Sequence, residues 1–160
     1  MKTTNSNIRK HVEIHTDGAC IENPGPGGWA AVIRALDGPV ELKRNQLVGS
    51  TGATTNNRME LTAVIEALDA VKPTWPVTVY TDSKYVSEGA TEWLPGWIAK
   101  GWKNSSRKPV ANRDLWERLN ELLSKHSVVF RWVRGHAGNE LNELADDLAN
   151  AAAMAAAQRA

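Results

Sequence analysis

Two aspartates, Asp17 and Asp82, stand where predicted strands end, and their carboxylates are well placed for chemistry. Each follows a short run of alternating or β-branched residues. In open α/β sheets, ligands bind beyond the carboxyl ends of neighbouring parallel strands. Two carboxylates at one sheet edge repel each other unless they share a proton or a cation. The pair therefore predicts proton or metal chemistry. Taken singly, each has a plainer role, Asp17 as a turn residue before Gly18 and Asp82 as a helix cap before Ser83.

Glu60 is a third acidic candidate, on a predicted helix that connects these two strands. It lies at the edge of the apolar face of that helix, so we expect it to point toward the sheet. The alternative is a capping role, because residues 57–60 have the spacing of a capping-box variant in which Glu60 bonds back to the helix start. Both readings remain open from the sequence.

Two further candidates lie near the C-terminus. His136 is flanked by glycines in residues 135–138, where no apolar pattern would bury it, and this setting favours a site over a core histidine. Asp146 and Asp147 are adjacent on the predicted last helix. Helical spacing alone does not decide which of them faces a site.

Periodicity predicts the elements that must position these residues. Alternation and β-branched runs indicate five strands, at residues 12–17, 29–36, 40–48, 77–82 and 128–133. Apolar residues at helical spacing indicate a helix from Asn57 that ends before Pro73. Further helices are expected within 83–98, as two short pieces interrupted at Gly89 and at residues 95–96, at 114–124, and from Asn139 onward. The glycine- and proline-rich run 23–28 is read as a connection.

The order of these elements predicts an α/β fold with one mixed sheet. Short turns between the first three strands favour an antiparallel meander. The crossover through the helix after Asn57 places strand 77–82 parallel to the first strand. We expect a single domain over residues 1–160, with a polar leader at 1–10 and an alanine-rich helical tail at 151–160 that frays.

Composition limits the functional classes. The 160 residues contain 19 basic and 18 acidic residues, which excludes nucleic-acid binding by bulk charge alone. The single cysteine, Cys20, excludes an internal disulfide and favours a reducing compartment. The sequence has neither a stretch of about 20 apolar residues nor a secretory signal, so we expect a cytoplasmic protein. Residues 100–113 form one local patch that is basic and free of acids.

Several segments closely resemble one known family, the bacterial ribonuclease HI enzymes. The resemblance runs in order from Val12 to Met154. The segments that carry it are 16–20 (TDGAC), 23–28 (NPGPGG), 54–60 (TTNNRME), 80–83 (YTDS), 101–103 (GWK), 114–116 (DLW) and 135–138 (GHAG), followed by Asn142, Glu143 and Asp146. Five main motifs in register make the resemblance specific.

The resemblance implies a fold and an activity. The fold would be ribonuclease H-like, with a five-stranded mixed sheet of three antiparallel strands plus parallel strands, flanked by helices. The activity would be endonucleolytic cleavage of the RNA strand of an RNA–DNA hybrid, leaving 5′-phosphate and 3′-hydroxyl ends. Two Mg²⁺ ions, with Mn²⁺ as a substitute, would serve as cofactors. The carried-over metal ligands are Asp17, Glu60, Asp82 and Asp146, and His136 is the mobile histidine.

The resemblance also assigns substrate contacts. Residues matching the RNA-side contacts are Cys20, Asn23, Asn56, Glu60 and the backbone of Lys84, and those matching the DNA-side contacts are Thr55, Asn57, Ser83, Trp93 and Asn112. The basic patch matches the protruding handle of the family, through Lys100, Trp102, Lys103 and Lys108. Ile98 and Ala99 are apolar where lysines can occur, which lowers the expected affinity of the handle. The plainer readings are turns and caps for the asparagines and core packing for most tryptophans.

Two other functions compete with this prediction. A different nuclease or strand-transfer protein can use a similar sheet, since one fold hosts many functions. A hybrid-binding module without catalysis is the second alternative, and it predicts the loss of at least one of the four carboxylates. We expect a monomer whose partner is an RNA–DNA hybrid and that does not bind membranes.

Overall fold

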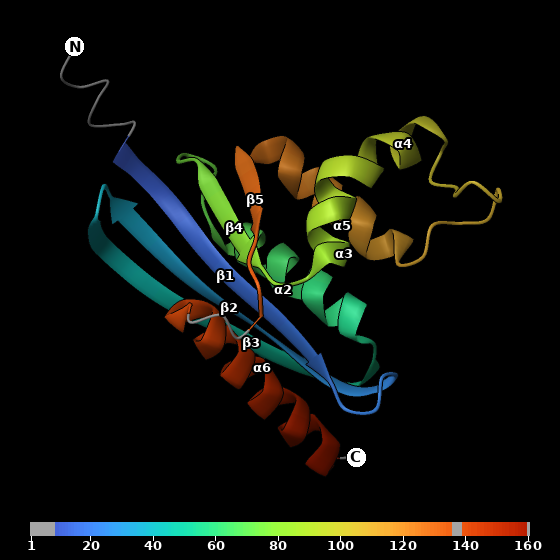
Figure 1. Cartoon of the computed structure of the whole chain (residues 1–160), viewed down its shortest axis with the longest axis horizontal. Coiled ribbons are helices and arrows are strands. Elements are labelled where there is room, and N and C mark those ends of the chain that lie inside the picture. Colours follow the sequence, from blue (N-terminus) through green and yellow to red (C-terminus); the bar gives the residue numbers. More distant parts are fainter. Residues whose placement is uncertain (1–8, 136–138, 160) are drawn as a thin grey trace.

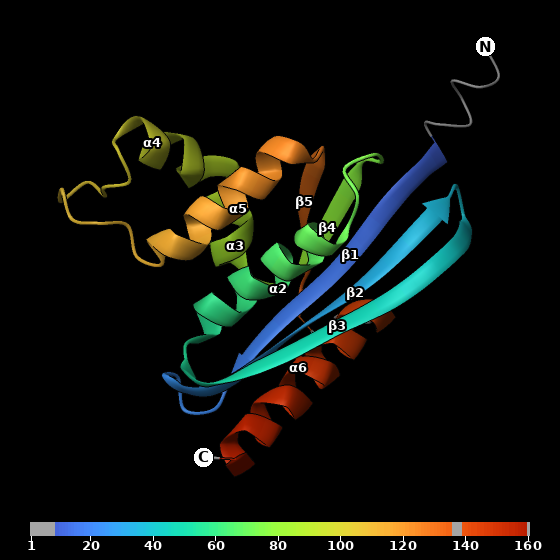
Figure 2. The same cartoon turned by 180° about the vertical axis from the view of Figure 1, so that it is seen from behind.

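The computed structural model describes residues 9–135 and 139–159. A five-stranded sheet in the order β3-β2-β1-β4-β5 forms its centre. Figures 1 and 2 show that α6 lies on one face of this sheet, whereas α2, α3, α4 and α5 gather on the other side. The three layers bury a core in which Ile14, Leu61, Val79 and Trp116 are fully enclosed.

The strands have the predicted connections. β1 (Lys10–Cys20), β2 (Gly25–Asp37) and β3 (Val40–Thr54) form an antiparallel meander. β4 (Val77–Thr81) pairs in parallel with β1, and β5 (Val128–Trp132) pairs in parallel with β4. The carboxyl ends of β1 and β4 therefore meet at one edge, which confirms the expected mixed sheet.

Three predicted strand boundaries were wrong, because β1 runs past Asp17, β2 begins well before Trp29 and β3 ends well after Val48. The glycine-rich run is part of the ladder, with Gly27 opposite Cys20 and Gly28 opposite Ala19. Its composition reflects the close approach of α6. A Cβ atom at Gly28 would lie 2.5 Å from the Ala149 carbonyl oxygen. β3 likewise continues to Thr54, beyond the predicted end at Val48.

The helices agree with the periodicity in most places. They are α2 (Asn56–Ala70), α3 (Lys84–Glu88), the short π-helical segment η1 (Gly89–Trp93), α4 (Leu94–Ala99), α5 (Arg113–Lys125) and α6 (Glu140–Arg159). Gly89 does not break the helical path, contrary to the prediction. A Cβ atom there would lie 2.2 Å from the Trp116 ring, so the glycine provides space for the buried indole.

The alanine-rich tail extends α6 as predicted but is packed instead of frayed. Ala153 and Ala156 are buried against the sheet. Near the end of the helix, the Arg159 guanidinium donates to Ser50 Oγ at 2.8 Å. Small side chains on this face let the helix lie close to the strands. No helix in the described ranges is long and apolar enough to cross a membrane.

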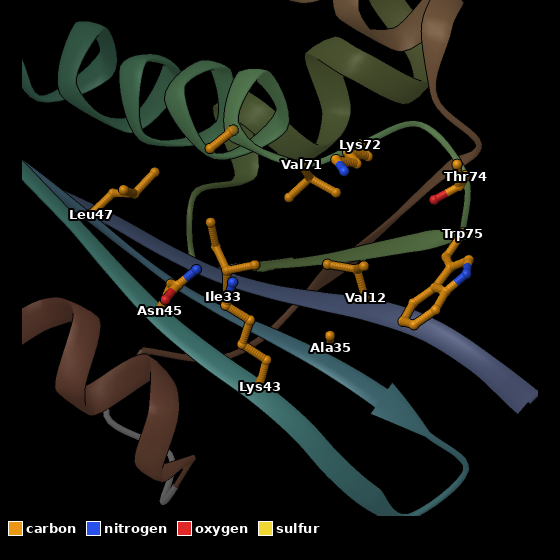
Figure 3. Close-up of a pocket in the computed structure, with 11 residues that line it drawn as sticks. Val12, Ile33, Ala35, Lys43, Asn45, Leu47, Val71, Lys72, Thr74 and Trp75 are labelled. Carbon is orange, nitrogen blue, oxygen red and sulfur yellow. The ribbon is translucent and has the colours of Figure 1, made fainter.

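A pocket of about 350 Å³ lies between the end of α2 and the sheet. Figure 3 shows Val71 and Lys72 above it, Trp75 at one side and Lys43 approaching from β3. Its lining includes Val12, near the start of β1, so the pocket lies away from the strand ends that carry the acidic residues. None of its lining residues is a carboxylate.

Candidate active site

Three carboxylates from three elements meet at the sheet edge. Asp17 lies on β1, Glu60 on α2, and Asp82 follows β4 directly. One carboxylate oxygen from each lies within 4.8 Å of the others. Asp146, on α6, shares a hydrogen bond with Asp17. The fold therefore brings together the four acids that the resemblance implied.

Local geometry explains why α2 can bring its carboxylate so close. A Cβ atom at Gly18 would lie 2.5 Å from the Glu60 amide nitrogen, so only glycine permits this approach of α2 to β1. The capping alternatives for Glu60 and Asp82 were wrong. Thr55 Oγ1 caps α2 by accepting from the Arg58 amide at 3.2 Å, and Ser83 Oγ caps α3 by accepting from the Val86 amide at 3.1 Å.

Burial and mutual repulsion hold protons on this cluster. Burial, the hydrogen bond with Asp146 and repulsion from Asp82 raise the pKa of Asp17 to about 8, although the Gly18 amide acts in the opposite direction. Burial, followed by repulsion from Asp17 and Asp82, raises the pKa of Glu60 well above its usual range. Bringing such groups together is costly unless protons or a cation compensate the charge.

The donor set fits a hard divalent cation. Glu60 Oε1 is buried and has no hydrogen-bond partner among the described residues. An orphaned carboxylate oxygen costs free energy in a folded protein unless a ligand satisfies it. The three clustered groups offer oxygen atoms alone, which suits Mg²⁺, Ca²⁺ or Mn²⁺ and not thiolate-preferring metals. A divalent cation would both satisfy Glu60 and relieve the repulsion.

The two acids on α6 have different surroundings. Asp146 is partly buried and accepts from the Asn150 amide nitrogen at 3.0 Å, in addition to its contact with Asp17. Asp147 is exposed. The ambiguity left by helical spacing thus has a structural answer in favour of Asp146. His136, the remaining predicted catalytic residue, lies outside the described residues.

The predicted RNA-side residues surround the start of α2. Asn23 Oδ1 accepts from the Asn56 amide at 3.1 Å, which ties the loop after β1 to the helix. Both asparagines are exposed next to the acidic cluster, and so is Asn57. The Cys20 thiol points inward, with Sγ 3.4 Å from the carbonyl oxygens of Gly25 and Thr54. Cys20 therefore offers its backbone rather than its thiol to a ligand.

Three of the predicted DNA-side residues, Thr55, Trp93 and Asn112, contact Arg58 or Tyr85, neither of which the sequence singled out. Asn112 Oδ1 accepts from Arg58 at 3.3 Å, and its amide nitrogen donates to the Tyr85 hydroxyl at 3.0 Å. The partly exposed Trp93 ring lies edge-on to Tyr85, at 6.0 Å between centroids. Arg58 lies in the first turn of α2 and also donates to Asp114, which is 56 residues away in the chain. Local sequence patterns do not predict this contact.

The basic handle is a protruding loop at residues 100–112, seen beside α4 and α5 in Figure 1. The Asn104 side chain closes it by accepting from the Lys108 amide at 3.1 Å, and Lys103 pairs with Pro109 across it. The Trp102 carbonyl accepts from Val110 at 3.1 Å. The ion pairs of the described residues include none of Lys100, Lys103 and Lys108. Their charges are therefore available to an anion.

One exposed aromatic residue beside the cluster was missed. Trp132, at the end of β5, donates from Nε1 to the Asp82 carbonyl oxygen at 2.9 Å. The Lys84 ammonium group lies over the Trp132 ring, 4.9 Å from the ring centroid. The place of Trp132 in a strand of apolar residues made it look like core in the sequence, yet it is 44% exposed.

Comparison with known proteins is consistent with this geometry. A family model described as RNase H matches residues 9–154. The "Ribonuclease H" of Jannaschia sp. (strain CCS1) is 56% identical, covering 86% of this chain and 87% of its own length. That of Albidiferax ferrireducens is also 56% identical, with 87% and 91% covered. The crystal structure of LC9-RNase H1 superposes with a TM-score of 0.81 at 36% identity, covering 91% of this chain and 73% of that one. The chain belongs to the ribonuclease H family.

Proposed function

We propose that this chain is a metal-dependent endonuclease that hydrolyses the RNA strand of RNA–DNA hybrids, leaving 5′-phosphate and 3′-hydroxyl ends. The meeting of Asp17, Glu60 and Asp82 at one sheet edge, with Asp146 bonded to Asp17, carries the proposal. Membership of the ribonuclease H family supports the choice of substrate. The intact acid set argues against a binding module without catalysis.

The four acids would hold two Mg²⁺ ions, for which Mn²⁺ could substitute. Bound ions of this kind activate a water molecule and stabilise the leaving 3′ oxygen in phosphoryl transfer. Asp17 lies among the other acids, with a carboxylate oxygen within 4.8 Å of oxygens of Glu60 and Asp82 and a hydrogen bond to Asp146, so it would help to hold both ions. Glu60 and Asp82 would supply further carboxylate oxygens to the ions, and Asp146 would help hold the ion that activates the water. His136 would help to deprotonate the water or to release the product.

The exposed asparagines and the capped helix starts hold the substrate. Asn23 and Asn56 present amide groups that both donate and accept, which suits recognition of 2′-hydroxyls on the RNA strand. The Lys84 backbone belongs to the same set, and the lysines of the handle bind phosphates of the hybrid. On the DNA side, Thr55 binds a backbone phosphate, and Asn57 and Ser83 bind the same strand. Trp93 and Asn112 contact the deoxyribose strand.

We place the enzyme in the cytoplasm as a monomer and treat residues 1–160 as one catalytic domain. The single cysteine, Cys20, suits a reducing compartment, because it has no partner for an internal disulfide. Sedimentation velocity at micromolar concentration should give one species near the 17.5 kDa of the chain. A dimer at that concentration would contradict the proposed oligomeric state.

The decisive experiment is a cleavage gel with one labelled RNA. The RNA is presented in an RNA–DNA hybrid, in duplex RNA and alone, with Mg²⁺ or with EDTA, and labelled duplex DNA is added as a further substrate. We expect cleavage of the hybrid with Mg²⁺ only. Cleavage of RNA without its DNA partner, or of duplex DNA, would favour the alternative nuclease function.

Two adjacent variants test the role of the carboxylates in the same assay. Asp146→Asn should lower hybrid cleavage at least about 100-fold, because it removes a proposed metal ligand. Asp147→Asn is the matched control, since it makes the same change one residue further along α6 on an exposed side chain. Equal activity of the two variants would contradict the assignment of Asp146.

A further inference from the structure

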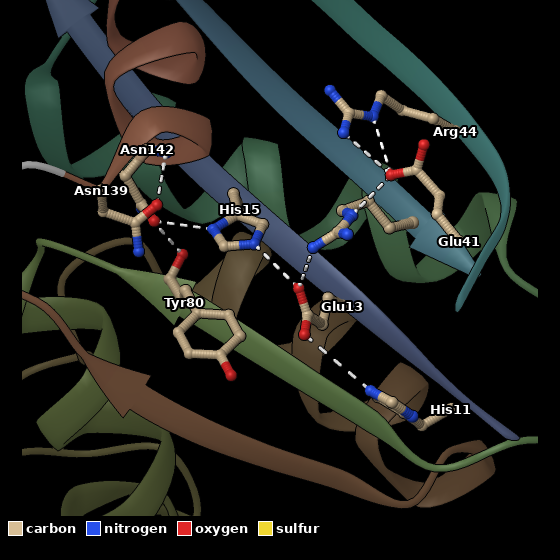
Figure 4. A network of polar contacts seen from close by, with 9 residues as sticks. His11, Glu13, His15, Glu41, Arg44, Tyr80, Asn139 and Asn142 are labelled. Carbon is tan, nitrogen blue, oxygen red and sulfur yellow. Dashed lines mark hydrogen bonds and ion pairs between the residues drawn. The ribbon is translucent and has the colours of Figure 1, made fainter. Parts of the chain in front are cut away.

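His15 is a buried polar residue on the sheet face that α6 covers. It is 4% exposed, and its ring stacks on Tyr80 of β4 with 4.7 Å between centroids and 7° between planes. Its Nδ1 lies 2.7 Å from the Asn142 amide oxygen, across the interface between β1 and α6 (Figure 4). Because an amide oxygen only accepts, His15 Nδ1 carries the hydrogen of this short bond.

Asn142 is held at three points in the first turn of α6. Besides the bond to His15, its amide nitrogen donates to the Tyr80 carbonyl oxygen at 3.4 Å, which defines the orientation of the amide group. Its backbone amide donates to the Asn139 side chain at 3.2 Å, the capping contact that begins the helix. Figure 4 shows these contacts converging from β1, β4 and α6.

The same two elements carry the contact between Asp17 and Asp146. His15 and Asp17 are two residues apart on β1, and so lie on one face of the strand. Asn142 and Asp146 are four residues apart on α6, and so lie on one face of the helix. Two strand residues span about 6.6 Å and four helical residues about 6 Å. The His15–Asn142 and Asp17–Asp146 contacts therefore match in register.

Apart from the Arg159–Ser50 hydrogen bond near the end of the helix, the α6 interface with the sheet consists mostly of small side chains. Ala145, Ala149 and Ala153 pack against the sheet, and Gly28 presents bare backbone to the helix. Alanine and glycine surfaces allow close approach, but their contacts are not directional. The hydrogen bond between His15 and Asn142 is directional and partly buried, and Glu13 lies 3.4 Å from the other ring nitrogen of His15.

We infer that His15 is a positioning residue that acts through Asn142. The bond sets the axial position and rotation of α6 on β1, and thereby places the Asp146 carboxylate against Asp17. The inference rests on the proposed function, in which Asp146 is a metal ligand. His15 itself contacts neither substrate nor metal in this role.

Two variants at this position separate the hydrogen bond from the ring. His15→Phe keeps a ring that can stack on Tyr80 but removes the donor. His15→Asn removes the ring but places an amide N–H close to the position of Nδ1. His11→Phe is the matched control, because His11 lies on the same face of β1 and its ring nitrogen is 3.8 Å from Glu13.

We expect His15→Phe to lower kcat about fivefold, the effect of losing one net hydrogen bond, with the KM for hybrid unchanged. The apparent affinity for Mn²⁺, titrated without hybrid, should fall by a similar factor. Backbone amides of residues 142–146 should exchange faster with solvent. His15→Asn should retain more activity and slower exchange than His15→Phe, and His11→Phe should resemble the parent protein in all three measurements.

The outcomes distinguish this inference from the proposed function. If the parent protein does not cleave hybrid, the proposed function is wrong. Amide exchange in residues 142–146 still tests whether His15 positions α6. If the parent cleaves hybrid and His15→Phe matches it in kcat, Mn²⁺ affinity and exchange, His15 does not position α6. Better retention by His15→Phe than by His15→Asn would assign the role to ring packing and would overturn the inference.

Discussion

At the scale of single residues, the position of Asp17 among other acids lowers the stability of the fold but suits its carboxylate to bind a metal ion. The residue is 5% exposed, and its carboxylate lies close to three other acids. Burial is the largest reason that its pKa rises to about 8, and the neighbouring acids add to the effect. A folded protein tolerates such a group only if other interactions compensate for it. The site without metal therefore destabilises the folded state.

The elevated pKa values predict how stability depends on pH without metal. The usual value for Asp17 is 3.8 and its folded value is about 8, so between these limits the folded state binds more protons than the unfolded state. Stability from this group is therefore fully present below pH 3.8 and is lost as pH rises through about 8. Glu60 shifts in the same direction. Urea unfolding in EDTA should give a free energy of unfolding that falls from pH 5 toward pH 8.

The variant Asp17→Asn checks the sign of this effect. In EDTA at pH 8 it should be more stable than the parent by roughly 2 kcal/mol, because it removes a buried charge among like charges. Its stability should also depend less on pH, and it should cleave hybrid at least about 100-fold more slowly. Added Mg²⁺ should stabilise the parent more than the variant. A variant that is less stable than the parent at pH 8 would show that repulsion is not the dominant effect.

At the scale of elements, glycines decide how closely the helices reach the sheet. Gly18 lets α2 bring Glu60 against β1, and Gly28 lets α6 lie on β2. In both places an added Cβ atom would meet backbone atoms at 2.5 Å, which cannot move as a flexible side chain can. The positions of two of the four acids therefore depend on residues that carry no functional group.

The substitution Gly28→Ala tests this dependence. Its methyl group would lie 2.5 Å from backbone atoms of Ala149 and Ala153, so α6 must shift. Overpacking of this kind costs about 1–3 kcal/mol, and the displaced Asp146 should lower activity. Gly52→Ala is the matched control, because a Cβ atom at that position of β3 has nothing within 4 Å. Thermal and urea unfolding of both variants, with hybrid cleavage, would measure the difference, and equal stabilities would contradict a tight α6 contact.

At the scale of the whole molecule, a small net charge conceals two regions of opposite sign. Leaving out the four site carboxylates leaves 14 acidic residues against 19 basic ones. The four site acids gather near the carboxyl ends of β1 and β4, whereas Lys100, Lys103 and Lys108 are exposed residues of the protruding handle loop. Such a separation suits a ligand that is itself a polyanion and is cut where cations are bound.

Replacing Lys100, Lys103 and Lys108 together by alanine should test the handle. We expect a higher KM for hybrid, with kcat little changed. A plot of log KM against log salt concentration should be less steep, by the amount that corresponds to the loss of about two to three phosphate contacts. Lys10, Lys43 and Lys72 are the matched control triple, because they surround the pocket at the other end of the sheet. Steady-state kinetics across a series of salt concentrations give both slopes. Equal slopes for the two triple variants would show that the handle is not part of the binding surface.

Local sequence patterns determined the order of the strands and helices and the identity of the acidic residues. The alternation in β1 and the apolar face of α2 are properties of neighbouring residues, so they can be read without the fold. Crossover handedness then predicted that β4 lies beside β1 and that Asp17 and Asp82 share an edge. The motif resemblance chose Asp146 over Asp147 and identified the family.

Only the tertiary structure decided what depends on contacts between residues distant in the chain. The glycine-rich run is part of the sheet and lies under α6, and Glu60 lies among the other acids because Gly18 lets α2 approach β1. The helical path continues through Gly89, where the absence of a side chain leaves space for the Trp116 ring. His15 and Asn142 are 127 residues apart, and no local rule connects them. Propensity and spacing describe a few neighbouring residues, whereas these contacts exist only once the layers are packed together.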